Sequence, residues 1–270
     1  MSGDQYRVIV SGDCSPTATS SAATLTVSTA LYAFTSHTFT PCGATGRYGP
    51  TLSTCRSNYS TSWDENDSYF YMTDQGIQLW TVPADGTYRI TVVGAEGGRG
   101  KQYDTYVYSS GVPGKGASIQ GDVALSRGDV IQIAVGQKGG EDLSTYHQRG
   151  GGGGGGSYIM TSSDVPIIVA GGGGGSGRYD GNNGDGGVTA TSGTAGNGSG
   201  GAGGTGGLGG AVNSCSYAGG SGAGYLGNGV NKTSGHPLSF TNGCVGASKC
   251  TNWTEGNVGG FGGGGGTGPH

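Results

Sequence analysis

Three segments between residues 76 and 175 alternate apolar and polar positions in the way that β-strands do. Each holds two short apolar runs around a polar turn, and each is followed by a glycine tract. Two such runs predict a β-hairpin, so we expect three hairpins, with turns at Pro83–Gly86, Ser126–Asp129 and Thr161–Asp164. An apolar period of 3.6 residues is absent throughout, so the sequence predicts no helix.

Residues 1–29 form a further unit of two β-type runs, YRVIVSGD and AATLTV, joined by the turn-rich CSPTATSS. This pattern predicts a hairpin with a longer loop. It resembles the last two strands of a bacterial immunoglobulin-like domain. No body of such a domain precedes it, so we expect its strands to need a partner outside this copy of the chain. For the same reason Cys14 is expected to be unpaired or intermolecular.

Glycine dominates the chain after Val93, because all but seven of the 65 glycines lie there. A composition of this kind favours disorder, since glycine loses the most backbone entropy on folding. The glycine runs nevertheless adjoin well-formed strand sequence, as in PIIVAGGGGG. The alternative to disorder is a packed bundle of polyproline II helices, whose free amides and carbonyls bond to neighbouring tracts. We expect such a bundle over residues 176–270.

Charge, hydropathy and cysteine spacing argue against a nucleic-acid-binding, membrane-spanning or metal-binding protein. The net charge is −4 and no basic stripe exists, which argues against a nucleic-acid partner. No apolar run is long enough to cross a membrane. No metal-type cysteine or histidine spacing is present, so we expect disulfides, an oxidising extracellular setting and no cofactor. The disulfide candidates are Cys42, Cys55, Cys215, Cys244 and Cys250, and the sequons for glycosylation start at Asn58, Asn66, Asn197, Asn231 and Asn252.

The ordered motifs FTPCGATGRYGPTLSTC, GIQLWTVPADGTYRITVVGAEGGRG, GDVIQIAVGQKGG, GGGGGGGSYI and IIVAGGGGG carry a further resemblance. Their order is similar to that in the extracellular glycine-rich domain of the anaplastic lymphoma kinase and leukocyte tyrosine kinase receptors. Similar modules occur in bacterial surface and phage appendage proteins. The resemblance implies an all-β fold, a TNF-like jelly-roll sandwich over residues 30–175 carrying packed polyglycine helices. It also implies a Cys42–Cys55 disulfide, a loop shaped by Gly46, Gly49 and Pro50, and Trp80 and Tyr88 in or near the core.

The chemistry-bearing side chains do not form a catalytic constellation, and we expect no enzymatic activity. The stretch around Asp64, Glu65 and Asp67 could bind calcium or a sugar, but a solvated acidic loop is the favoured interpretation. An aromatic patch could stack on carbohydrate, with ordinary strand packing as the alternative. It consists of Tyr103, Tyr106 and Tyr108.

Two functions follow from these features. The first is an extracellular structural protein, a fibre or filament subunit that assembles head-to-tail by donating its N-terminal strands. The second is an adhesin or phage receptor-binding module that recognises a surface glycan or protein. We favour the fibre subunit, because the hairpin requires a partner and the aromatic patch does not. In either case we expect a secreted, cell-surface or virion protein whose chain continues beyond both ends of this sequence.

Overall fold

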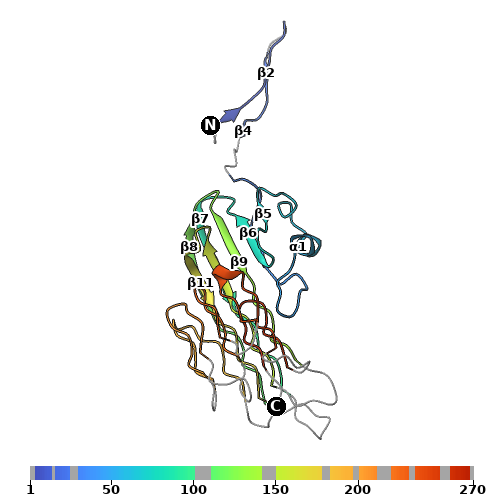
Figure 1. Ribbon diagram of the computed structural model, residues 1–270. Coiled ribbons are helices and arrows are strands. Elements are labelled where there is room, and N and C mark those ends of the chain that lie inside the picture. Colours follow the sequence, from blue (N-terminus) through green and yellow to red (C-terminus); the bar gives the residue numbers. More distant parts are fainter. Residues whose placement is uncertain are drawn as a thin grey trace.

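The computed structural model describes most of the chain and places it in three parts: a hairpin, a β-sandwich and a glycine bundle (Figure 1). The hairpin and the glycine bundle lie at opposite ends of the sandwich (Figure 1). No helix in the described part of the chain is long and apolar enough to cross a bilayer. The described residues are 4–13, 16–24, 30–100, 111–141, 150–177, 183–196, 201–211, 220–230, 235–249 and 256–267.

The N-terminal hairpin forms as the sequence predicts, but with an irregularity. Strands β1 (Gln5–Tyr6) and β4 (Ala23–Thr24) pair antiparallel, and so do β2 (Ile9–Val10) and β3 (Ala18–Thr19). The second run has one more residue between its paired segments than the first, which is a β-bulge. Every described residue of this hairpin from Gln5 onward is exposed.

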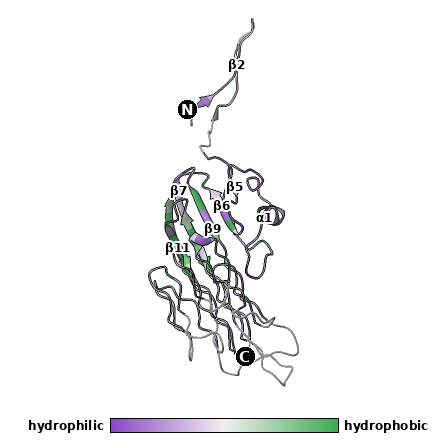
Figure 2. Ribbon diagram, viewed as in Figure 1, coloured by the Kyte–Doolittle hydropathy of each residue, from purple (hydrophilic) through white to green (hydrophobic). Residues whose placement is uncertain are grey.

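The sandwich consists of a five-stranded sheet in the order β11-β10-β9-β6-β5 and a two-stranded sheet of β7 and β8. All neighbouring strands are antiparallel. The strand bounds are β5 (Phe70–Tyr71), β6 (Ile77–Thr81), β7 (Gly86–Val93), β8 (Ser118–Leu125), β9 (Val130–Ala134), β10 (Ser157–Thr161) and β11 (Pro166–Ala170). Figure 2 shows hydrophobic residues along these strands. The all-β fold class is therefore confirmed.

Only the third of the three predicted hairpins exists, that of β10 and β11. The first two predictions are wrong, because β6 and β9 are central strands with both edges paired in the larger sheet. The chain therefore crosses to the other sheet after β6 and returns before β9. Two backbone bonds hold the crossings together: Val82 N–H donates to the Asp129 carbonyl (2.8 Å) and Gly128 N–H to the Val82 carbonyl (2.9 Å).

Both faces of the five-stranded sheet are buried, which explains why β6 is buried at every position. One face, which carries Trp80, packs against β7, β8 and a cluster of aromatic rings that includes Trp63. The rings of Trp80 and Tyr88 lie 5.8 Å apart, which confirms their predicted place in or near the core. The other face packs against Phe240 and Phe261, which the glycine-rich part of the chain contributes.

One short helix, α1 (Leu52–Asn58), corrects the expectation that the chain has no helix. The Thr51 side chain caps it by accepting a bond from the Thr54 amide (3.2 Å). A helix of seven residues spans only about two turns and is too short to show an apolar period, so periodicity could not predict it. The cap and the Cys55 disulfide described below hold it in place instead.

The glycine tracts form a bundle of extended helices joined by backbone hydrogen bonds, as the sequence predicts. In the run 150–156, amides three residues apart donate to the same neighbouring tract, which is the period of a polyproline II helix. The donor–acceptor pairs are Gly151–Ser176 and Gly154–Gly173, Gly152–Gly140 and Gly155–Gln137, and Gly153–Gly265 and Gly156–Gly262. All three neighbours run antiparallel to this tract, because the acceptor number falls as the donor number rises.

The bundle includes more of the chain than the segment 176–270. Tracts before residue 177 bond directly to later ones: Gly174 N–H donates to the Asp185 carbonyl and Gly140 N–H to the Val258 carbonyl. The boundary that we placed between residues 175 and 176 therefore falls within the bundle. Its tracts before that boundary are 94–100, 111–117, 136–140 and 150–156, and the tract 171–177 crosses it.

Candidate functional site

The disulfide-closed loop at the start of the sandwich has the structure that the family resemblance implies. Cys42 and Cys55 form a disulfide with a Cα–Cα distance of 5.0 Å. Gly46 has a positive φ of 86°, which favours glycine. A side chain at Gly49 would collide with Gly76 and with the ring of Phe261. The loop thus docks the sandwich onto the bundle. Its disulfide is typical of an oxidising compartment.

Cys244 is not in a disulfide, which corrects its place among the disulfide candidates. Its sulfur is completely buried in the cluster of Tyr158, Phe240 and Phe261, where it packs as a small apolar group. Burial raises the pKa of the Cys244 thiol, so the thiol stays protonated and unreactive. The other predicted cysteines, Cys14, Cys215 and Cys250, lie outside the described residues.

Two of the five sequons lie among the described residues, and both asparagines are exposed. Asn58 ends helix α1, where its side-chain amide donates to the Thr54 carbonyl (2.8 Å) and the Cys42 carbonyl (3.3 Å). The Asn66 side chain accepts a bond from the Ser68 amide (2.9 Å). The other three, Asn197, Asn231 and Asn252, lie outside the described residues.

The acidic stretch has a structural role, with one carboxylate buried rather than solvated. Asp64 is 1% exposed and accepts bonds from the amide and the hydroxyl of Thr61. Arg56 donates to the Asp64 carbonyl (2.8 Å) and forms ion pairs with Asp67 and Glu65. Within the described ranges, no group of three metal-binding side chains exists here or elsewhere. The carboxylates are thus already engaged by the protein itself.

His37 lies half-buried in the aromatic cluster, a feature that sequence reasoning did not single out. Its ring packs edge-on against Phe39, Tyr59 and Trp63 at centroid distances of 4.6, 4.5 and 4.9 Å. Its Nε2 atom is buried without a hydrogen-bond partner. Desolvation lowers the pKa of His37, and the nearby Asp64 carboxylate only partly opposes this effect. The ring is therefore held neutral as part of the core.

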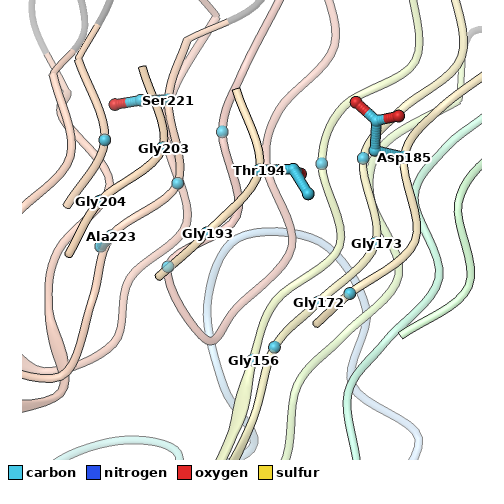
Figure 3. Close-up of a pocket in the computed structure, with 18 of the residues that line it drawn as sticks. Gly156, Gly172, Gly173, Asp185, Gly193, Thr194, Gly203, Gly204, Ser221 and Ala223 are labelled. Carbon is cyan, nitrogen blue, oxygen red and sulfur yellow. The ribbon is translucent and has the colours of Figure 1, made fainter. Parts of the chain in front are cut away.

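A cleft of about 1010 Å³ separates two groups of glycine tracts in the bundle. Figure 3 shows Gly156, Gly172 and Asp185 on one side and Gly193 and Gly203 on the other. Its described lining contains no histidine, cysteine, lysine or arginine. The described walls are mostly backbone, and Asp185 is the one carboxylate among them. The aromatic patch of Tyr103, Tyr106 and Tyr108 lies outside the described residues.

The hairpin is the most unusual surface of the described molecule. Within five residues it exposes Tyr6 (58%), Val8 (65%), Ile9 (58%) and Val10 (63%). A run of exposed apolar side chains on a strand is typical of an interaction site. Val8 and Ser20 bond to each other inside the hairpin. We therefore take the described residues of this N-terminal hairpin, 4–13 and 16–24, as the candidate functional site.

Comparison with known proteins finds a similarity, over part of the chain, to a receptor of the kind that the sequence resembles. The chain is 36% identical over 101 residues to the mouse leukocyte tyrosine kinase receptor. The matched region is 37% of this chain and 11% of the receptor, so the chain spans about a tenth of that relative. No protein-family model matches the chain. The similarity agrees with the resemblance drawn from the CGATGRYGPT motif and the glycine tracts, and it extends to part of the chain only.

Proposed function

We propose that this protein is a non-enzymatic extracellular structural module that assembles head-to-tail through its N-terminal hairpin. The main support is the exposure of Tyr6, Val8 and Val10 on a hairpin that projects from the sandwich (Figure 1). An isolated two-stranded hairpin is marginally stable in water, and its unpaired edges are ready to pair with another chain. The extracellular location is supported by the Cys42–Cys55 disulfide and by similarity to part of a receptor.

Head-to-tail assembly is the geometry that this arrangement favours. The hairpin and the glycine bundle lie at opposite ends of the sandwich, so a hairpin that binds the next copy leaves that copy's own hairpin free (Figure 1). A contact between two different surfaces does not close on itself unless the rotation allows a ring. Such a contact generates rows of subunits.

The double variant Val8→Asp/Val10→Asp tests this function. Both side chains are exposed, so the charges should leave the sandwich intact but prevent burial in an apolar interface. We expect the unaltered chain to form concentration-dependent oligomers in sedimentation velocity and the double variant to remain a monomer. Leu208→Asp is the matched control, because Leu208 is 58% exposed but lies in the bundle, and it should assemble normally. Monomers at every concentration for the unaltered chain would refute the proposal.

A second function, recognition of a surface protein or glycan, is favoured by the similarity to a receptor. A bundle with a backbone-lined cleft would then display the recognition surface, with the hairpin as a connector. Glycan-array or cell-surface binding by the monomeric Val8→Asp/Val10→Asp variant would support this alternative, because that variant cannot assemble. If neither the unaltered chain nor this variant bound a glycan or a cell surface, the recognition function would be refuted.

A further inference from the structure

The two sheets of the sandwich leave few edges that another strand could extend. At one edge of the larger sheet, β5 has only two residues. At its other edge, β11 begins with Pro166, and its pairing with β10 is interrupted after Ile159. Short strands, prolines and bulges are devices that block edge pairing. Within the described residues, strands β7 and β8 pair only with each other, have eight residues each and contain no proline, so their sheet carries the open edges.

The ladder between β7 and β8 determines which backbone groups face the open edge of β8. The Val93 carbonyl accepts a bond from the Ser157 hydroxyl (2.7 Å) and so points away from β8, which makes Val93 and Ser118 a non-bonded pair. Bonded and non-bonded pairs alternate along an antiparallel ladder, so Gln120 and Asp122 belong to non-bonded pairs. Side chains lie closer together in non-bonded pairs than in bonded ones. The side chains of Gln120 and Asp122 accordingly bond to those of their partners, Thr91 and Arg89. The backbone amides and carbonyls of both residues therefore point away from β7.

The core beneath this edge is incompletely covered. Ile119 and Val123 of β8, and Ile168 of β11, are only partly buried. Gly121 lies between Ile119 and Val123 on the same face and has no side chain to shield Ile168; a Cβ there would lie 3.5 Å from the Ile168 Cδ1 atom. A strand added beside β8 would lay alternate side chains over this margin.

The N-terminal hairpin has the complementary pattern. The backbone groups of Val8 bond inward, since its carbonyl accepts from the Ser20 amide (2.9 Å) and its amide donates to the Ser20 hydroxyl (2.9 Å). By the same alternation, the backbone groups of Arg7 and Ile9 point outward. In an extended strand Tyr6, Val8 and Val10 share one face, and Arg7 lies on the other.

We propose that the open edge of β8 is the acceptor for the N-terminal hairpin of a second copy, an inference that rests on the proposed function. An antiparallel register that sets Arg7 opposite Asp122 also sets Ile9 opposite Gln120, so the outward backbone groups of both strands meet. The guanidinium of Arg7 then lies beside the Asp122 carboxylate, which is about half exposed. On the other face the register makes three apolar contacts: Val8 fills the space above Gly121, Tyr6 meets Val123 and Val10 meets Ile119.

Proline at the outward-facing amide of β8 tests the acceptor. Gln120→Pro removes a donor that β7 does not use but the incoming strand needs. Its matched control is Thr91→Pro, because Thr91 is the cross-strand partner on β7 and both variants lose the same side-chain bond (2.7 Å). We expect Gln120→Pro to raise the concentration required for oligomers by about tenfold or more, since one lost ladder bond and one clash reach that size. Thr91→Pro should assemble as the unaltered chain does.

Hydrogen exchange on the unaltered chain gives a second readout that does not depend on a proline variant folding. The Gln120 and Asp122 amides should exchange at least about tenfold more slowly in oligomers than in dilute monomer, since one free edge becomes paired. The Thr91 amide should not change. Normal assembly of Gln120→Pro with no protection at Gln120 would overturn the acceptor while leaving hairpin-driven assembly intact. An unaltered chain that forms no oligomers would overturn both.

Discussion

At the scale of single residues, the glycines of the bundle act through what they lack. A Cβ built on Gly155 would overlap the Phe261 carbonyl oxygen, and one on Gly152 would overlap the Val258 carbonyl oxygen. Glycine is therefore required where a neighbouring backbone passes in contact, whatever the backbone conformation. The residues that support the bundle are thus those with no side chain, and its cohesion comes from backbone hydrogen bonds.

Gly155→Ala should lower the free energy of unfolding by about 1 to 3 kcal/mol or more, because the added methyl group overpacks a rigid contact. Gly150→Ala, in the same run, is the matched control. Its Cβ would meet neighbours at an ordinary 3.6 Å, so we expect a change within about 0.5 kcal/mol. Urea titration of both variants measures the difference. Equal stability of the two would show that close backbone packing does not select glycine here.

His37 should make the sandwich less stable in mild acid. Its pKa in the folded protein is lowered by burial, so the unfolded chain binds the proton more readily. Stability is therefore lost as the pH falls through the unfolded-state pKa of about 6.5, and the loss stops below the folded-state pKa. His37→Phe keeps a ring in the cluster without a titrating group, so its stability between pH 7 and 5 should vary less. Parallel pH profiles of melting temperature would contradict this account.

At the scale of elements, local pattern located the strands but not always their partners. The β10–β11 hairpin was predictable because both strands remain in one sheet on either side of a short turn. The turn at Ser126–Asp129 looks equally tight, yet it carries the chain from one sheet to the other. Pairing of this kind depends on which strands are buried on both sides, and the sequence around the turn does not encode it. The Thr51 cap was the one local signal for α1.

The candidate site was predictable in part. The exposed hairpin follows from the two β-type runs of residues 1–29, and the Cys42–Cys55 pair follows from the family resemblance. The acceptor edge could not be predicted, because it depends on the alternation of bonds between β7 and β8. The neutral His37 and the free Cys244 likewise depend on the aromatic and apolar clusters that only the fold assembles.

At the scale of the whole molecule, side-chain packing stabilises the sandwich and backbone hydrogen bonds stabilise the bundle, and the five-stranded sheet lies between the two. The five-stranded sheet is stabilised on one face by an aromatic core and on the other by Phe240 and Phe261 of the glycine-rich chain. Backbone bonds then extend the order through the bundle. The bundle therefore needs few apolar side chains. The exposed apolar run of the N-terminal hairpin is the surface that the single subunit leaves uncovered.

The most direct test of assembly through the N-terminal hairpin is negative-stain electron microscopy of the intact chain beside a chain that lacks residues 1–24. The described hairpin residues from Gln5 onward are exposed, so the shortened chain should keep its sandwich, bundle and Cys42–Cys55 disulfide. We predict rows of subunits for the intact chain and single particles for the shortened one. Rows formed equally well without the hairpin, or single particles for both chains, would contradict the account.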